Sequence, residues 1–316
     1  MKKKLFWTII IFFAFLLFCG LSVGFGVLAF KAMEGQPAFF TTTDSVALIR
    51  VEGVIQAGDP PSDVFGNTSE GAYSNRIVRD LRRAEDDPHI KAVVLRVDSP
   101  GGGVVASDEI YTQVKAMTKP VVVSMGTMAA SGGYYISAPA DEIWANRHTL
   151  TGSIGVIIQF VNIEGFMKKY GIGATTIKSG VNKDTGSLYR QPTPEEIAIW
   201  QKIVDEAYGI FVQIVAEGRG LDESTVRELA DGRVYTGQQA LDLHLVDHLG
   251  NLKDAINRAG ELGGIAGEPH VIDFRAPAPL LPGLFGALQK PSPAEELQTI
   301  LHIDASPSLM YLYTGN

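Results

Sequence analysis

Two largely apolar runs constrain the fold of this chain more than any other feature. They span residues 92–97 and 120–125, and a segment with helical character separates them. Strands that are apolar on both faces belong to parallel sheets whose two faces are covered. The order strand, turn, helix, strand is that of an α/β unit. We therefore expect an α/β fold with a parallel-sheet core and flanking helices.

The N-terminal segment predicts a membrane anchor. Lysines at positions 2–4 precede an almost unbroken apolar run from Leu5 to Phe30. A spanning helix needs about 20 apolar residues. The alternative, a cleaved signal peptide, has a shorter apolar region of roughly 7–15 residues. We expect an uncleaved, single-pass transmembrane helix in the cytoplasmic (inner) membrane. The lysines stay on the cytoplasmic side, so the rest of the chain lies outside the cytoplasm.

Composition divides the chain into four parts and excludes some partners. The predicted parts are residues 1–31 with the lysines and the anchor, 32–43 as linker, 44–275 as the folded domain, and 276–316 as a proline-rich tail. The net charge of -8 argues against nucleic acid as a partner. The single cysteine, Cys19, lies in the anchor, so the folded domain has neither a disulfide nor a thiolate metal site.

Further elements follow from apolar periodicity. Thr193-Pro-Glu-Glu196 is a strong helix start, with a threonine cap, proline at the first position and a capping-box glutamate. We expect the apolar stripe of this helix (Ile197, Trp200, Val204, Phe211 and Val215) to lie in the core. Other strands are predicted at 46–55, 142–145 and 174–177, and other helices at 76–85, 107–116 with Ser107 as cap, 162–170, 221–230, 237–243 and 251–262. Residues 56–74 are predicted to form a loop, and the tail is expected to pack loosely on a neighbour through Leu280, Leu281 and Leu284.

Ser131 is a candidate nucleophile. It lies between two alanines and a glycine pair, a short way after the second apolar run. A serine at a tight strand-to-helix turn presents its hydroxyl to a substrate, and the segment differs from the nucleophile elbow by Ala129 in place of the first glycine. The alternative interpretation is a packing contact between small residues.

The groups that would assist a serine nucleophile are less certain from the residues alone. Residues 98–103 end the first apolar run with three glycines, whose amides can approach a substrate closely and hold an oxyanion, or which form an ordinary turn. The candidate bases are Lys178 and Lys183, if burial leaves one of them neutral, and six histidines that carry no triad or metalloprotease spacing. These histidines are His89, His148, His244, His248, His270 and His302.

Five segments in series resemble the signal peptide peptidase A family in its short, single-domain form. They are Arg96–Gly103, Ser124–Tyr135, Thr149–Val156, Lys178–Asp184 and Asp231–Gly237, and the resemblance covers roughly residues 46–262. The family includes an N-terminal anchor, which also fits this chain. The resemblance implies the fold shared by Clp protease and crotonases, and a membrane-bound serine endopeptidase with a Ser/Lys dyad.

The resemblance also assigns roles to individual residues. The nucleophile falls on Ser131, the general base on Lys183 and a supporting hydroxyl on Ser153. The oxyanion donors fall on the amides of Gly102 and Gly132. Asp98 stands where some members carry asparagine, and the tail after about Pro277 lies outside the resemblance. No cofactor and no metal are implied.

The expected substrates are remnant signal peptides and other apolar peptides at the extracytoplasmic membrane face. The family assembles into rings or domes, so we expect a homo-oligomer, for example an octamer. One alternative is a Ser/Lys membrane protease that cleaves a specific membrane protein with a stomatin-like partner. Two others are a crotonase-type acyl-CoA enzyme, disfavoured by the extracytoplasmic location, and an inactive scaffold, disfavoured by the joint presence of Ser131, Ser153 and Lys183.

Overall fold

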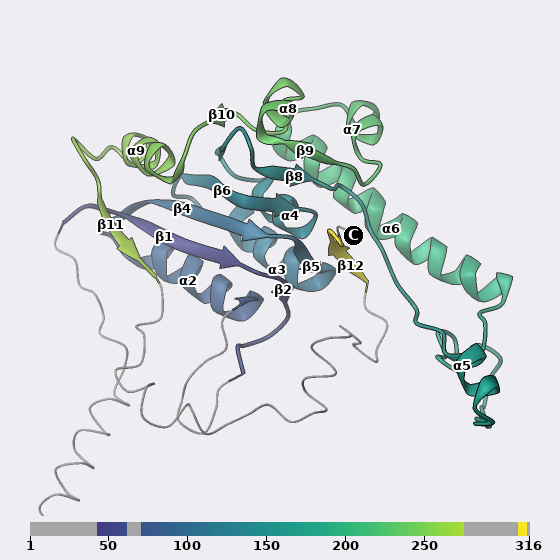
Figure 1. Cartoon of the computed structure of the whole chain (residues 1–316). Helices are drawn as coiled ribbons and strands as arrows, with labels where there is room; N and C mark the ends of the chain where they lie inside the picture. Colours follow the sequence, from purple (N-terminus) through teal and green to yellow (C-terminus); the bar gives the residue numbers. More distant parts are fainter. Residues whose placement is uncertain (1–42, 62–70, 275–308, 315–316) are drawn as a thin grey trace, which may run out of the picture. The chain divides into compact units, whose positions relative to one another are not determined.

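The computed structural model describes residues 43–61, 71–274 and 309–314, and Figure 1 shows how their elements are arranged. The predicted anchor, nearly all of the linker, the three tail leucines and His302 lie outside the described residues. Within the described ranges, no helix has both the length and the apolar composition that a membrane span needs.

A parallel sheet forms the centre of the fold and confirms the predicted α/β core. Its central strands are β1 (Ser45–Glu52), β4 (Ile90–Ser99), β6 (Val121–Ala130) and β7 (Glu142–Ala145). The strand order is β10-β7-β6-β4-β1-β11, with β10 (His248–Leu249) and β11 (His270–Asp273) at the edges. All of these neighbours pair in parallel, and Leu48, Val94 and Val122 lie side by side across three strands.

Both faces of this sheet are buried over most of its length, which explains why its strands are largely apolar. Val46, Leu48 and Val94 point to one face, where α9 (Leu252–Leu262) packs through small residues. Their neighbours in sequence, such as Ile49 and Val93, point to the other face. There α2 (Ser74–Asp86) and α3 (Val104–Lys115) cover the sheet, as Figure 1 shows. Alternate residues of each strand thus reach two separate apolar clusters.

A second, smaller sheet lies at the carboxyl ends of the central strands. Its order is β12-β5-β2-β3, made by β12 (Met310–Leu312), β5 (Gly101–Gly103), β2 (Ile55–Gln56) and β3 (Ala72–Tyr73). The last part of β6 pairs in parallel with β8 (Leu150–Gly152), which also pairs antiparallel with β9 (Val234–Thr236). The segments that carry Ser131, Ser153 and the glycines at positions 101–103 therefore meet where the two sheets adjoin.

The remaining helices lie mainly in the second half of the chain. The long helix α6 (Pro194–Arg219) begins with the predicted capping box at Thr193 and Glu196 and ends at left-handed Gly220, with φ of 62°. The shorter helices are α4 (Gly132–Ser137), α5 (Glu164–Lys169), α7 (Glu223–Leu229) and α8 (Gly237–Asp242). In Figure 1, α5 lies beyond the N-terminal end of α6, away from the parallel sheet.

Three predictions about local structure were wrong. Helix α3 begins at Val104 with Gly103 as its cap, so Ser107 lies inside the helix and is buried. Residues 174–177 form no strand. They are exposed, and no described strand lies beside them to pair with their backbone. Only the C-terminal half of the α6 stripe lies in the core: Phe211 is fully buried, whereas Ile197 is 54% exposed, because the helix extends beyond the sheet.

Candidate active site

Ser131 lies at the turn that joins β6 to α4. Its backbone has a φ of 53° and a ψ of -115°, a conformation that is costly for a residue with a side chain. Its amide donates to the carbonyl of Gly152 (2.8 Å), and its carbonyl accepts from the amide of Tyr135 (2.8 Å). The surrounding structure thus holds a strained serine at a strand-to-helix turn, the geometry in which a nucleophile protrudes from a sheet.

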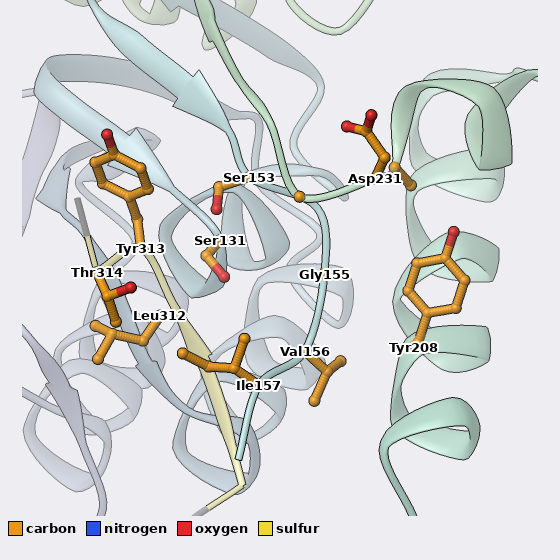
Figure 2. A pocket seen from close by; sticks show the side chains of 12 residues that line it. Ser131, Ser153, Gly155, Val156, Ile157, Tyr208, Asp231, Leu312, Tyr313 and Thr314 are labelled. Atoms are coloured by element: carbon orange, nitrogen blue, oxygen red, sulfur yellow. The ribbon is translucent and has the colours of Figure 1, made fainter. Parts of the chain in front are cut away.

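Ser153 lies next to Ser131. It directly follows β8, which pairs with the end of β6, and it also has a positive φ, of 50°. Its amide donates to the carbonyl of Arg233 (2.8 Å). Both serines line one cavity of about 430 Å³, and Figure 2 shows their side chains close together within it. The structure therefore brings the predicted nucleophile and the predicted supporting hydroxyl into one site.

The amides of Gly102 and Gly132 lie close to each other. A Cβ atom on Gly132 would stand 3.1 Å from the amide nitrogen of Gly102 and 2.6 Å from Oγ of Ser107. A Cβ atom on Gly102 would stand 2.0 Å from the carbonyl oxygen of Ile55, in the neighbouring strand β2. Both positions thus require glycine for close backbone approach. Two neighbouring amides beside a serine are what an oxyanion hole needs.

The chain's own C-terminal strand lies in the groove beside these amides. Strand β12 pairs antiparallel with β5, with Tyr311 opposite Gly102. Bonds from the Val104 amide to the Leu309 carbonyl (3.3 Å) and from the Tyr313 amide to the Pro100 carbonyl (2.8 Å) flank this pair. On its other side, Met310 exchanges two hydrogen bonds of 3.0 Å with Ile157. The segment is therefore bound as an added strand between two backbone edges, a common mode of peptide recognition.

The carbonyl group of Tyr311 faces the amide of Gly102 and lies near the amide of Gly132. A Cβ atom on Gly101 would stand 2.1 Å from the carbonyl oxygen of Tyr311 and 2.6 Å from the amide nitrogen of Gly132. Bonded pairs alternate along an antiparallel ladder, so the Gly102 amide also faces this oxygen. Beyond Tyr311, Leu312 and the next two residues line the cavity that contains Ser131 (Figure 2). With this segment in the groove, Ser131 is only 1% exposed.

This strand is the part of the site that sequence reasoning missed. It falls in the segment that composition assigns to a loosely packed tail. Residues 309–313, Leu-Met-Tyr-Leu-Tyr, are rich in strand-forming side chains and follow a stretch rich in proline. The change from a proline-rich stretch to strand-forming residues was the signal that could have indicated a strand here. The partner strand is three glycines some 200 residues earlier, and no pattern in the sequence connects the two segments.

The two candidate lysines lie outside the Ser131 cavity. Lys178 donates to the carboxylate of Asp184 and to the carbonyl of Val181. Hydrogen bonds from Arg190, and then from Lys178, hold the pKa of Asp184 far below its usual range, so this ion pair persists at neutral pH. Lys183 is exposed and lies in the segment between α5 and α6, and its side chain has no hydrogen-bond or ion-pair partner in the described part of the chain.

Other titratable groups near Ser131 are few. None of the five histidines that the structure describes lines the cavity, and no group of metal-ligating side chains occurs among the described residues. Asp231 does line the cavity, opposite Tyr208 of α6. Hydrogen bonds from Arg233 lower the pKa of Asp231 to about 2, so a carboxylate stands at the mouth of the site.

Comparisons with known proteins identify the family of this chain. The model of peptidase family S49 matches residues 113–266. A protein from Synechocystis sp. named as a protease is 41% identical over 78% of this chain and 84% of its own length. One from Methanocaldococcus jannaschii, also named as a protease, is 35% identical over 86% of both chains. One from Enterococcus faecium, named as a signal peptide peptidase, is 41% identical over 67% of this chain and 62% of its own.

Among solved structures, a ClpP1 mutant from Listeria monocytogenes superposes with a TM-score of 0.43 and 17% identity. The superposition covers 66% of this chain and 94% of the other. A TM-score of this size supports no conclusion about activity or assembly.

Proposed function

The chain belongs to peptidase family S49 and is a serine peptidase, and from this we propose that it degrades remnant signal peptides and other apolar peptides, with Ser131 as nucleophile and Lys183 as general base. One observation carries the proposal. A peptide segment lies beside Ser131 as an added strand, and the carbonyl oxygen of its Tyr311 faces the amide of Gly102 and lies near the amide of Gly132. This arrangement is the one that a peptide substrate needs for attack by a serine.

The proposed reaction begins with acyl transfer to Ser131. Its Oγ attacks the carbonyl carbon, and the proton of the hydroxyl passes to Nζ of Lys183. The amides of Gly102 and Gly132 stabilise the negatively charged oxygen, and each such donor is worth about 3 kcal/mol. The carbon–nitrogen bond then breaks, and Lys183 returns the proton to the leaving amine. Water, deprotonated by Lys183, attacks the ester, and Ser131 regains its proton.

We propose that Lys183 reaches Ser131 from a second copy of the chain. In a single chain, Lys183 lies outside the cavity, exposed and without a partner among the described residues. The segment around Lys183 also exposes many large apolar side chains, which is unusual for a protein that works as a soluble monomer. The exposed large apolar side chains of residues 158–210 are Val161, Phe166, Tyr170, Ile172, Ile177, Val181, Tyr189, Ile197, Ile199, Ile203 and Ile210. Burial of this surface against another copy would desolvate the lysine as well as deliver it.

The location and substrates are part of the same proposal. The predicted anchor would hold the site at the extracytoplasmic face of the membrane, where cleaved signal peptides remain. The relative from Enterococcus faecium, named as a signal peptide peptidase, supports this substrate class. A homo-oligomer would enclose the sites, so that extended peptides enter and folded proteins do not.

A mixing experiment tests the dyad and its division between copies. Ser131→Ala and Lys183→Ala chains are each expected to be inactive against an apolar fluorogenic peptide. If each site takes its serine and lysine from different copies, random co-assembly at equal amounts restores about one quarter of wild-type activity. Lys178→Ala is the matched control and should retain activity, because Lys178 is paired with Asp184.

The outcomes separate the parts of the proposal. Activity in Lys183→Ala alone would refute the assigned base. Two inactive variants whose mixture stays inactive, although they co-assemble, would refute the division between copies and leave the dyad intact. A wild-type oligomer without activity on any peptide would refute the proposed function.

A further inference from the structure

The segment that carries Lys183 is a series of tight turns. Residues 170–193 belong to no helix or strand. Three backbone hydrogen bonds of 3.1 to 3.3 Å close the turns, and they are donated by the amides of Lys183, Thr185 and Ser187. Local turns without a ladder of strand or helix bonds open easily. A lysine that acts as a base from such a segment must therefore be held in place by other contacts.

Arg190 ties these turns to the first turn of helix α6. Its guanidinium group donates through Nε and Nη2 to the two carboxylate oxygens of Asp184, at 3.0 and 2.8 Å. Through Nη1 and Nη2 it also donates to the two carboxylate oxygens of Glu196, at 2.8 and 2.5 Å. The planar fork of arginine allows such paired contacts, which a lysine ammonium group cannot make. Asp184 directly follows Lys183, so this bridge acts next to the proposed base.

Glu196 gives the bridge a fixed end. Its side chain is buried and accepts from the amide of Thr193 at 2.9 Å, while its own amide donates to the Thr193 hydroxyl oxygen at 3.2 Å. The hydroxyl of Thr185 also donates to Glu196, at 3.2 Å, so a second bond joins the turns to the helix. Helix α6 is 26 residues long and is anchored in the core through Phe211. The carboxylate of Glu196 is therefore a rigid support for the turns.

Without the guanidinium group, the same two carboxylates would repel each other. Asp184 and Glu196 both accept from Nη2 of Arg190, so each has an oxygen within hydrogen-bond distance of one nitrogen. Like charges at such a short separation are unfavourable. Lys178 could offset only one of them, because its side chain bonds to Asp184 and not to Glu196. Loss of Arg190 is thus expected to move Asp184, and Lys183 with it, away from the helix.

We propose that Arg190 is a positioning residue for the general base. By joining Asp184 to Glu196, it fixes the turns that carry Lys183, so that the base reaches the serine of another copy in one orientation. The inference rests on the proposed function and adds to it the element that orients the donated lysine. Arg190 does not line the Ser131 cavity. Its loss should therefore lower kcat and leave KM for a short peptide nearly unchanged.

A mixing experiment shows whether the effect of Arg190 travels with the lysine. In co-assembled full-length chains, a Ser131→Ala chain donates only its lysine, and a Lys183→Ala chain donates only its serine. Arg190→Gln is added either to the lysine donor or to the serine donor. Restored activity of the first mixture should be at least about tenfold below that of the second, because only there is the working lysine displaced. A general defect in folding or assembly would lower both mixtures equally.

Lys178→Ala is the matched control in the lysine donor. It removes a cation from the same carboxylate of Asp184 but leaves the bridge from Arg190 to Glu196 intact, so it should lower the restored activity less than about threefold. Arg190→Lys keeps the positive charge without the fork and should recover only part of the loss. When every chain carries Arg190→Gln and an otherwise intact dyad, kcat should fall by the same factor as in the first mixture.

Hydrogen exchange tests the bridge without turnover. In the otherwise unchanged full chain, the amides of Lys183, Thr185 and Ser187 should exchange about tenfold faster in Arg190→Gln, because the turns lose their link to α6. In Lys178→Ala these amides should keep their rates. The buried half of α6 around Phe211 should exchange as in the wild type in both variants.

Equal activity of the two Arg190→Gln mixtures would overturn the positioning role, and unchanged exchange in residues 180–190 would overturn the bridge as its cause. Parent mixtures without restored activity would instead refute the division of the dyad between copies. In that case a lower kcat at unchanged KM, with faster exchange, upholds the positioning role within one chain, and an unchanged kcat overturns it. A wild-type chain that cleaves no peptide would refute the proposed function, and with it any role of Arg190 in catalysis.

Discussion

Replacement of Tyr311 by alanine should release the C-terminal strand from the groove. In the described structure, β12 contacts the rest of the fold through its pairing with β5 and Ile157 and through the buried Tyr311 ring. Short backbone pairing alone is weakly stable in water. Most of the free energy that holds this strand in place therefore comes from the tyrosine.

The expected magnitude follows from the burial of Tyr311. Replacement of a fully buried aromatic residue by alanine costs about 3–5 kcal/mol. A loss of about 3 kcal/mol lowers the ratio of docked to released strand by roughly 150-fold. Because docked strand and substrate need the same backbone edges, the same change should raise kcat/KM for a short peptide, by as much as about 100-fold if the docked form predominates in the wild type.

Hydrogen exchange in the Ser131→Ala chain and peptide cleavage in the chain with an intact serine measure the two effects. Amides of Met310 and Tyr313, which donate to Ile157 and Pro100, should lose their protection in Tyr311→Ala. Tyr313→Ala is the control, because its partly exposed ring contributes less, and its effect should stay below about tenfold. Unchanged protection and unchanged kcat/KM in Tyr311→Ala would refute the view that this residue anchors a competing strand.

Three further predictions concern the site and its support. Gly102→Ala should abolish activity and lower the unfolding temperature, because its Cβ would stand 2.0 Å from the Ile55 carbonyl oxygen. Alanine keeps the backbone amide, so an unchanged kcat with an unchanged unfolding temperature would contradict the close approach of β2 at this position. Ser153→Ala should lower kcat by about tenfold to a hundredfold with an unchanged unfolding temperature, since its hydroxyl lies beside Ser131 but carries little packing. Glu196 has its pKa lowered from 4.5 to about 2 by the Arg190 hydrogen bonds and the Thr193 amide. Its contribution to stability is therefore complete above pH 4.5 and is lost as the pH falls toward 2, so the urea midpoint should fall less steeply across this range in Glu196→Gln than in the wild type.

Local sequence predicted the central sheet because burial on both faces leaves a direct trace in composition. Val93 and Val94 point to opposite faces, and each meets an apolar cluster, so neither position tolerates a polar side chain. The capping box at Thr193 was equally predictable, since all of its bonds lie within four residues. By contrast, Ile197 follows the same helical stripe as Phe211 but lies where α6 has left the core. Periodicity identifies an apolar face and does not say whether anything covers it.

The residues of the candidate site also differ in how far the sequence could predict their positions. Ser131, Ser153 and the two glycines lie at the ends of strands that pair with one another, so the fold brings them together within one chain. The contact of Tyr311 with Gly102 joins segments far apart in sequence, and only the structure reveals it. Lys183 lies away from this cluster, on a segment whose large apolar side chains are exposed and are not covered by other described residues.

The C-terminal strand beside Ser131 and the distant position of Lys183 together suggest a physical reason for the proposed assembly. A peptidase whose dyad were complete in each chain would hold its own C-terminal strand at a competent serine as soon as it folded. With the lysine supplied by another copy, the serine stays inactive until chains associate, so the bound segment is safe in the monomer. In the proposed assembly, association both buries the apolar segment that carries Lys183 and completes the site. Activity that rises with the second or higher power of protein concentration, at concentrations below full assembly, is the kinetic consequence; a constant activity per chain on dilution to monomer would exclude it.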